Sequence, residues 1–230
     1  MLRSWSMPLR ASSGVRPMGK KKGDLPLTTF KVNKYVRIMP SEYDDTPLGM
    51  GPGASRFSSP SGQYNVLYAA SDVRTATAET LIRDRFVDDD ERLIAQDDVT
   101  SKSIVRVSSK KAANLVDLRK PNSLAYGIDT DVSGARAHGA GQKFSERVYN
   151  TSEEIDGILY ESRFTGELCT VFFDRAVERC LDAGKCTPLT AEPELEGALE
   201  EFNVELIPAD EDGGDWDDDE DELDDDDVED

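Results

Sequence analysis

The sequence between Val66 and Glu79 reads VLYAASDVRTATAE, and it predicts a strand that leads directly into a helix. Residues 64–70 are bulky and β-prone, which favours a strand. Ser71 or Asp72 can cap a helix that begins after them, and residues 76–82 are rich in alanine and leucine, which favour that helix. Glu79 is therefore expected on a helix that packs beside the strand.

The segments before and after residues 66–79 are short, and the sequence predicts both strands and helices among them. We expect strands at Lys34–Met39, Ser103–Val107, Asn114–Leu118, Gly157–Glu161, Leu168–Phe173 and Asn203–Ile207, and helices at Pro121–Tyr126, Gln142–Tyr149 and Pro193–Glu201. The strands at 103–107 and 114–118 are expected to pair, those at 157–161 and 168–173 to form a hairpin around Gly166, and residues 88–98 to be a charged surface segment. Helices at irregular intervals among short strands predict an α+β domain with a mixed sheet.

The loop from Pro40 to Gln63 is rich in proline, glycine and serine. A loop of this length inside a compact domain is usually functional or disordered. Arg56 and Phe57 stand between small residues in it, so we expect it to be functional.

The charge of the chain is concentrated at one end. The formal net charge is −20, and residues 210–230 hold 16 acidic residues and no basic one. The other 31 acidic and 27 basic residues give a balance of only −4. We expect a disordered tail at 210–230, either solubilising, or a decoy for a basic partner, or an autoinhibitory arm. Residues 1–30 are expected as a flexible basic leader, and residues 31–209 as the folded domain.

Several classes of function are disfavoured. The sequence has no basic stripe with interleaved aromatic residues, so nucleic-acid binding is not expected. His138 is the sole histidine, and Cys169, Cys180 and Cys186 lack zinc-finger spacing, so no metal site is expected. An odd number of cysteines without a secretory signal indicates reduced thiols and a cytoplasmic protein. No stretch has the roughly 20 apolar residues that a membrane helix needs.

Four polar residues lie in apolar or small-residue surroundings: Arg56, Tyr68, Glu79 and Ser162. The segments around them resemble the RES family in order along the chain. The opening strand of the family is similar to Tyr35-Val36-Arg37-Ile38. Its central block is similar to three segments, Arg56-Phe57-Ser58, residues 66–70 and residues 76–79. Its closing block is similar to residues 156–163 together with residues 168–173. The family takes its name from an Arg, a Glu and a Ser, which match Arg56, Glu79 and Ser162. Ala54 and Ser55 precede Arg56, and Phe57 follows it, where family members often carry two glycines and a tryptophan.

The resemblance implies a mixed-sheet fold like that of ADP-ribosyltransferases. It also implies a hydrolase or phosphorylase that consumes NAD as its substrate by cleaving the nicotinamide–ribose glycosidic bond, with no further cofactor. Many members are toxins of toxin–antitoxin pairs, so a helix-turn-helix antitoxin is an implied partner. A protein ADP-ribosyltransferase and a non-enzymatic interaction protein that works through the acidic tail are the alternatives, and homo-oligomer formation is left open.

These residue types suit that chemistry. Cleavage of the glycosidic bond develops positive charge on the ribose, which the carboxylate of Glu79 would stabilise. Guanidinium groups bind pyrophosphate in a forked geometry, which suits Arg37 and Arg56, and the ring of Tyr68 could stack on nicotinamide. Ser162 would hydrogen-bond the substrate or hold Glu79.

Each residue also has a purely structural interpretation. Arg37 would pair with a carboxylate, Tyr68 would pack in a strand and Ser162 would sit in a turn. Glu79 is the residue whose burial is most costly without a function. His138, near Gly139 and Gly141, is interpreted as a loop residue, with a substrate contact as the minority alternative.

Overall fold

The computed structural model describes residues 24–83, 85 and 91–208. The strands are β1 (Leu27–Phe30), β2 (Tyr35–Pro40), β3 (Val66–Ala70), β4 (Arg92–Ala95), β5 (Lys102–Ser109), β6 (Ala113–Asp117), β7 (Gly157–Glu161), β8 (Leu168–Phe173), β9 (Leu181–Ala183), β10 (Thr187–Pro188) and β11 (Val204–Ile207). The helices are α1 (Val73–Thr77), α2 (Gln96–Thr100), α3 (Lys120–Tyr126), α4 (Asp131–Gly134), α5 (Gly139–Thr151), α6 (Asp174–Cys180) and α7 (Leu195–Glu201). Two 3₁₀ turns (Ser41–Tyr43 and Leu189–Ala191) and a π-helical turn, η2 (Ala78–Ile82), complete these elements.

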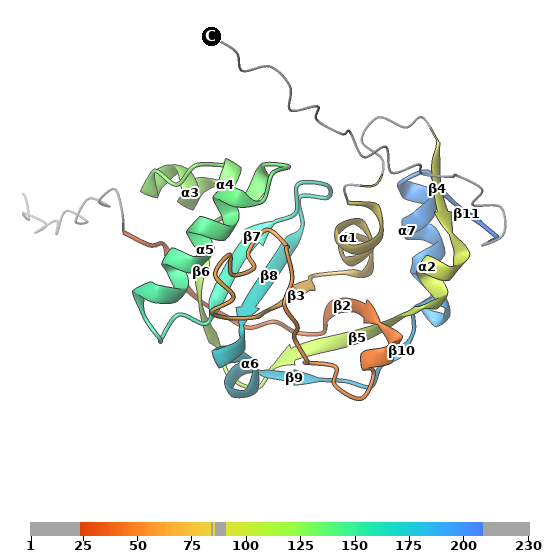
Figure 1. The fold of residues 1–230 in the computed structure, drawn as a ribbon, viewed down its shortest axis with the longest axis horizontal. Helices are drawn as coiled ribbons and strands as arrows, with labels where there is room; N and C mark the ends of the chain where they lie inside the picture. The colour runs from red at the N-terminus through yellow and green to blue at the C-terminus, as the bar shows by residue number, and fades with distance from the viewer. Residues whose placement is uncertain (1–23, 84, 86–90, 209–230) are drawn as a thin grey trace, which may run out of the picture.

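The main sheet is mixed, as the sequence predicts for an α+β domain. Its strands follow the order β1-β6-β7-β8-β3-β2-β5-β10, and β9 adds to β5. Strands β6 and β7 are parallel, whereas β3 runs antiparallel to both β8 and β2. A separate pair of parallel strands, β4 and β11, stands at one end of the molecule beside α2 and α7 (Figure 1).

The unit at residues 66–79 forms as the sequence indicates. Strand β3 ends at Ala70, and the carboxylate of Asp72 accepts the backbone N–H of Thr75 at 2.7 Å, so Asp72 is the N-cap of α1. The hydroxyl of Ser71 donates to the Asp72 carboxylate, also at 2.7 Å. Helix α1 then continues into the π-helical turn η2, which carries Glu79.

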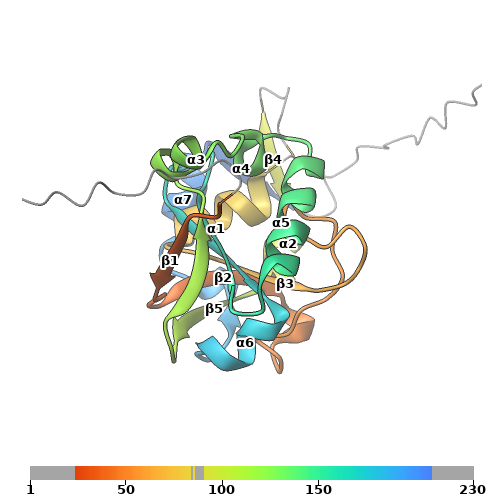
Figure 2. The same ribbon diagram turned by 90° about the vertical axis from the view of Figure 1, so that its left-hand side faces the viewer.

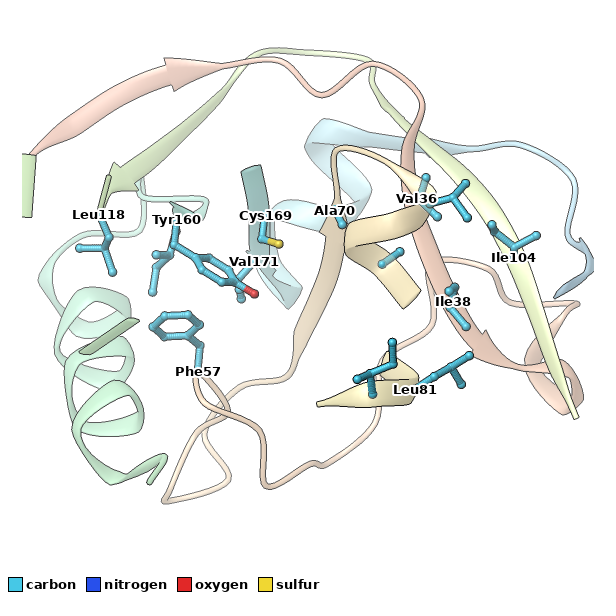
Figure 3. Packing of buried hydrophobic residues seen from close by; sticks show 14 of the residues in the cluster. Val36, Ile38, Phe57, Ala70, Leu81, Ile104, Leu118, Tyr160, Cys169 and Val171 are labelled. Carbon is cyan, nitrogen blue, oxygen red and sulfur yellow. The ribbon is translucent and has the colours of Figure 1, made fainter. Parts of the chain in front are cut away.

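Helices cover both faces of the sheet (Figures 1 and 2). The first core cluster gathers residues of α1, η2 and α5 with the side chains of one sheet face, among them Val36, Ala70 and Leu81, as Figure 3 shows. The second cluster gathers residues of α6 with the side chains of the opposite face, among them Tyr35 and Leu67. Because successive strand residues point to opposite faces, β2 and β3 supply both clusters.

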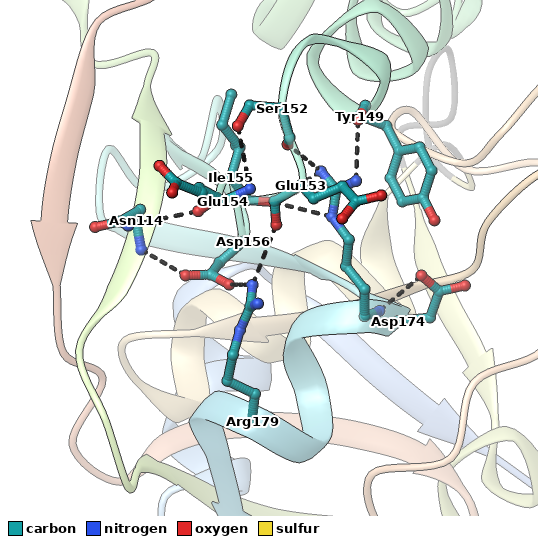
Figure 4. A network of polar contacts seen from close by, with 10 residues as sticks. Asn114, Tyr149, Ser152, Glu153, Glu154, Ile155, Asp156, Asp174 and Arg179 are labelled. Carbon is teal, nitrogen blue, oxygen red and sulfur yellow. Dashed lines mark hydrogen bonds and ion pairs between the residues drawn. The ribbon is translucent and has the colours of Figure 1, made fainter.

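A polar network closes the end of the sheet near the start of β7 (Figure 4). The buried carboxylate of Asp156 accepts the backbone N–H of Asn114 at 2.7 Å and is paired with the guanidinium of Arg179. The guanidinium of Arg175 donates to backbone carbonyls at and after the C-terminal end of α5, those of Tyr149, Ser152 and Ile155. These contacts satisfy carbonyls that a helix end otherwise leaves without partners.

Most of the expected elements are confirmed, including the hairpin around Gly166, where φ is +77°. The expected pairing of residues 103–107 with 114–118 is wrong: β5 pairs with β2, β9 and β10, whereas β6 pairs with β1 and β7. The described part of the charged surface segment at 88–98 forms β4 and the start of α2, elements that the sequence did not predict, and its residue Ile94 is buried.

The two termini of the chain lie largely outside the described residues. Leu27–Phe30 falls within the expected leader but forms β1, which pairs with β6 in the main sheet. The acidic tail at 210–230 is outside the described range, so its expected disorder stays a prediction. In the part of the chain that the structure describes, no helix is both long and apolar enough to span a bilayer.

Candidate functional site

A cavity of about 320 Å³ lies on the face of the sheet that α1 and η2 cover. Its floor is made of strands β2 and β3, with Val36, Ile38 and Val66, and its wall is made of α1 and η2. Polar groups reach it from several elements: Ser55, Tyr68, Glu79, Thr80, Arg83, Tyr160 and Cys169. An apolar cleft with a few convergent polar groups is the usual form of a small-molecule site.

Glu79 stands at the wall of this cavity on the π-helical turn η2. Its side chain is 16 % exposed, and its Oε2 lies 3.8 Å from Nη1 of Arg83, which follows it by four residues and is 13 % exposed. Short π-helical turns are frequent at functional sites. The structure therefore places Glu79 as a carboxylate that is largely shielded from solvent and borders a cavity.

His138 is close to this pair and immediately precedes α5. Its Nε2 lies 2.5 Å from Nη2 of Arg83, and its Nδ1 lies 2.8 Å from the carbonyl oxygen of Ala54. His138 lies in the loop before α5, as the sequence indicates, and its ring also joins Ala54 to Arg83, the residue that follows η2.

Arg56 is 4 % exposed, and its guanidinium donates to the carbonyl of Ala135. Burial lowers the pKa of Arg56, and the positive charges of Arg83 and Arg163 lower it further, whereas Glu79 acts in the opposite direction. Three arginines thus bring positive charge to one region around Glu79. Such a region favours an anionic ligand.

Tyr68 lines the cavity, and its hydroxyl fastens the loop that carries Arg56. The hydroxyl oxygen accepts the Oγ–H of Ser55 and the backbone N–H of Phe57, each at 2.9 Å. Burial raises the pKa of Tyr68, so the phenol is neutral and keeps its own hydrogen to donate. Tyr68 therefore contributes to the site through its hydroxyl as well as its ring.

Tyr160 and Cys169 line the same cavity, and the sequence did not single them out. Both are buried, and burial is the largest cause that raises the pKa of each side chain. The ring of Tyr160 packs edge-on against Phe57, with centroids 5.3 Å apart (Figure 3). Alternation in β7 would have put Ile158 and Tyr160 on one face, but the identity of that face depends on distant strands.

Arg37 borders the cavity as part of β2, but its side chain leaves the sheet on the opposite face. Tyr35 and Met39 belong to the second core cluster, whereas Val36 and Ile38 belong to the first, so Arg37 points with the former pair. There its Nη2 donates to the carbonyl of Gly49 at 2.7 Å, and burial lowers its pKa. The structure therefore does not bring the Arg37 guanidinium together with Glu79.

Ser162 is buried at the start of the turn between β7 and β8 and is not among the cavity-lining residues. Its Oγ accepts the backbone N–H of Phe164 at 3.2 Å, and its own backbone N–H donates to Glu167 at 2.8 Å. The N–H of Gly166 donates to the Ser162 carbonyl. In this geometry Ser162 shapes the hairpin, which is the turn role that the sequence allowed.

The described residues include no group of three or more His, Cys, Asp or Glu side chains arranged to hold a metal ion. The charged and aromatic groups that the described residues bring to the cavity are the carboxylate of Glu79, the guanidinium of Arg83 and the phenols of Tyr68 and Tyr160, whereas Arg56 is not among the lining residues. These can hold an anionic substrate and stabilise developing positive charge.

Comparison with known proteins bears on this site. A protein of Sinorhizobium fredii (strain NBRC 101917 / NGR234) described as probable toxin y4kH is 33 % identical over 93 residues, which are 40 % of this chain and 73 % of the relative. The fold is similar to that in a crystal structure of the M. tuberculosis MbcT–MbcA toxin–antitoxin complex, with a TM-score of 0.53 and 14 % identity over 75 % of this chain and 92 % of that one.

The model of the RES domain matches residues 34–192, which run from the start of β2 to the turn before α7 and include the whole cavity. The expected fold and resemblance are therefore confirmed, and this chain belongs to the RES-domain family.

Proposed function

We propose that this protein consumes NAD as a substrate by cleaving the bond between nicotinamide and ribose, and that Glu79 is the catalytic carboxylate. The observation that carries the proposal is the position of Glu79, a largely buried carboxylate at the wall of a cavity that Tyr68 also lines. Departure of nicotinamide leaves positive charge on the ribose, and a fixed carboxylate in a site shielded from water stabilises that charge strongly.

The surroundings of Glu79 are consistent with a dinucleotide that carries a pyrophosphate. Arg56, Arg83 and Arg163 add positive charge around it, and a buried guanidinium binds phosphate oxygens in a planar, two-pronged geometry. Tyr68 and Tyr160 are the aromatic groups available to the nicotinamide ring in this cavity. Arg37 is also among the residues that line the cavity, although its Nη2 donates to the carbonyl of Gly49, so its contact with the substrate stays a prediction.

The attacking group is water or inorganic phosphate, which gives a glycohydrolase or a phosphorylase. We further propose that the protein acts in the cytoplasm as the toxin of a toxin–antitoxin pair, with a helix-turn-helix protein as its antitoxin. The support is that one relative is described as a probable toxin and that a protein of the same fold occurs in a toxin–antitoxin complex.

The test is NAD loss on incubation with purified full-length protein, with and without inorganic phosphate. Glu79→Gln keeps the shape of the side chain and removes its charge, so we expect a rate about 10²- to 10³-fold lower. Glu178→Gln is the matched control, because Glu178 lies on the exposed side of α6, and it should leave the rate unchanged. Normal turnover by a folded Glu79→Gln variant would remove Glu79 from the catalytic role.

The products distinguish the reaction types. Free ADP-ribose indicates hydrolysis, ADP-ribose 1-phosphate indicates phosphorolysis, and a protein whose mass rises by one ADP-ribosyl group indicates transfer. If the wild-type protein gives none of these and leaves NAD intact, the proposed function is wrong. Growth arrest on expression, relieved by co-expression of a neighbouring helix-turn-helix gene, would test the toxin assignment separately.

A further inference from the structure

The side chains of Arg83 and His138 meet beside the cavity, and neither has a role in the function proposed above beyond the charge of Arg83. Nη2 of Arg83 and Nε2 of His138 are 2.5 Å apart. The other terminal nitrogen of Arg83, Nη1, lies 3.8 Å from Oε2 of Glu79. The other imidazole nitrogen, Nδ1, lies 2.8 Å from the carbonyl oxygen of Ala54. One continuous chain of polar contacts therefore runs from the loop to the catalytic carboxylate.

The partners of His138 fix where its hydrogen must be. A guanidinium can only donate hydrogen bonds, so Nε2 has to be the unprotonated nitrogen. A carbonyl oxygen can only accept, so Nδ1 has to carry the hydrogen. The geometry thus specifies the neutral Nδ1–H tautomer of His138. A doubly protonated ring would set a second N–H and a positive charge against Arg83.

We propose that His138 is a positioning residue for the Glu79 site and that it acts through Arg83. An arginine side chain is long and has many rotamers, so each contact made by its guanidinium restricts where that group lies. The lone pair of Nε2 holds the opposite side of the guanidinium. Because Nδ1–H is bonded to Ala54, the imidazole is itself held by the loop that carries Arg56. His138 thereby couples the carboxylate to the arginine loop across two separate parts of the chain.

The first experiment reads the tautomer directly and needs no enzymatic activity. His138 is the sole histidine of the chain, so an untagged protein labelled with ¹⁵N-histidine gives the signals of one imidazole. At neutral pH we expect a protonated Nδ1 and an unprotonated Nε2. A spectrum of the Nε2–H tautomer, or of a protonated ring, would overturn the proposal.

The same spectrum can be recorded for two variants. Arg83→Met removes the donor to Nε2, and we expect the imidazole to leave the single Nδ1–H tautomer for a mixture. Arg147→Met is the matched control, because Arg147 is an exposed residue of α5 that does not line the cavity, and the His138 signals should not change. If Arg83→Met leaves those signals where they are, Arg83 does not fix the ring. Should that variant fail to fold, the wild-type spectrum alone decides.

The second experiment is kinetic and rests on the proposed function. Gln in place of His138 presents an amide oxygen near the position of Nε2, whereas Asn presents its amide nitrogen near the position of Nδ1. His138→Asn should lower kcat for NAD about 10-fold or more, with a smaller effect on KM, because misplacement by a fraction of an ångström is costly in a catalytic site. His138→Gln should recover most of that loss, because it keeps an acceptor for Arg83.

The outcomes separate the two proposals. A wild-type protein that does not consume NAD removes the proposed function, and the tautomer measurement still decides the role of His138. A wild-type protein that consumes NAD, with equal kcat values for His138→Gln and His138→Asn, would show that the contact with Arg83 does not position Glu79.

Discussion

Gly141, the third residue of helix α5, lies directly against Arg56. A Cβ atom added at Gly141 would be 2.6 Å from the carbonyl oxygen of Arg56 and 2.7 Å from its Cγ. Real Cβ atoms essentially never approach other atoms so closely. The close approach of helix α5 to the arginine loop therefore requires glycine at this position.

Gly141→Ala should displace Arg56 and destabilise the protein by about 1–3 kcal/mol, the usual cost of overfilling a packed region. Where the protein remains folded, the KM for NAD should rise, because the guanidinium of Arg56 moves. The measurements are urea unfolding and steady-state kinetics. Gly139→Ala, two residues earlier in the same helix, meets nothing within 4 Å and should leave KM unchanged.

Arg56→Lys should weaken NAD binding. A lysine ammonium is a point charge and cannot donate to Ala135 while it also binds a phosphate in a two-pronged geometry. Calorimetric titration is best done in the Glu79→Gln background, where NAD should survive the experiment. Arg147→Lys serves as the control, and identical dissociation constants for both variants would assign Arg56 a structural role.

Tyr68→Phe should lower the free energy of unfolding by about 1–3 kcal/mol, because the N–H of Phe57, a fully buried residue, loses its acceptor. The loss should be larger than in Tyr43→Phe, since Tyr43 is an exposed residue, with 52 % of its surface accessible to solvent. Chemical denaturation of the two variants side by side gives the comparison. If Tyr68 only packs its ring in the strand, the variant will be nearly as stable as the wild-type protein.

Asp117 should make the stability depend on pH in the acid range. Burial raises the pKa of this carboxyl, but hydrogen bonds from the Arg119 side chain and backbone and from Asn122 outweigh burial, so the folded pKa is lowered. The contribution of Asp117 to the free energy of unfolding is therefore complete above the pKa of the carboxyl in the unfolded chain, about 3.9. It is lost as the pH falls through the lower pKa of the folded protein. Asp117→Asn should be less stable than wild type by about 1–3 kcal/mol at pH 7. The free energies of unfolding of the wild-type protein and of Asp117→Asn, measured by chemical denaturation, should converge below pH 4. A difference between the two proteins that stays constant down to pH 2 would contradict this prediction.

Local sequence was sufficient for the elements whose signals lie within a few residues of each other. The cap at Asp72 and the turn at Gly166 are of this kind, and both were predicted. The expected pairing of residues 103–107 with 114–118 failed because two neighbouring β-prone segments look like a hairpin in sequence. Their real partners are far along the chain, and no local pattern specifies them.

The candidate site shows the same division. Glu79 could be found from its apolar surroundings, and Arg56 and Tyr68 from the segments that resemble the family. His138 contacts Arg83, which is 55 positions away in the sequence, and Ala54, which is 84 positions away. No argument from the spacing of residues could predict contacts over such separations. Arg37 was expected to bind the substrate because its residue type fits, and the face of β2 to which its side chain points could not be predicted, since that depends on how α1 and α6 pack.

The position of β3 between β8 and β2 has a consequence for biosynthesis. Its hydrogen bonds to β8 reach across about a hundred residues, as in the bond from the Thr170 hydroxyl to the Ala69 carbonyl, which spans 101 positions. While the ribosome has yet to deliver residues 168–173, the strand that carries Tyr68 has one unpaired edge and the floor of the cavity is unsupported. Contacts that are so distant along the chain form late and slowly. A nascent chain, or one released early by premature termination before β8, should therefore have no working site.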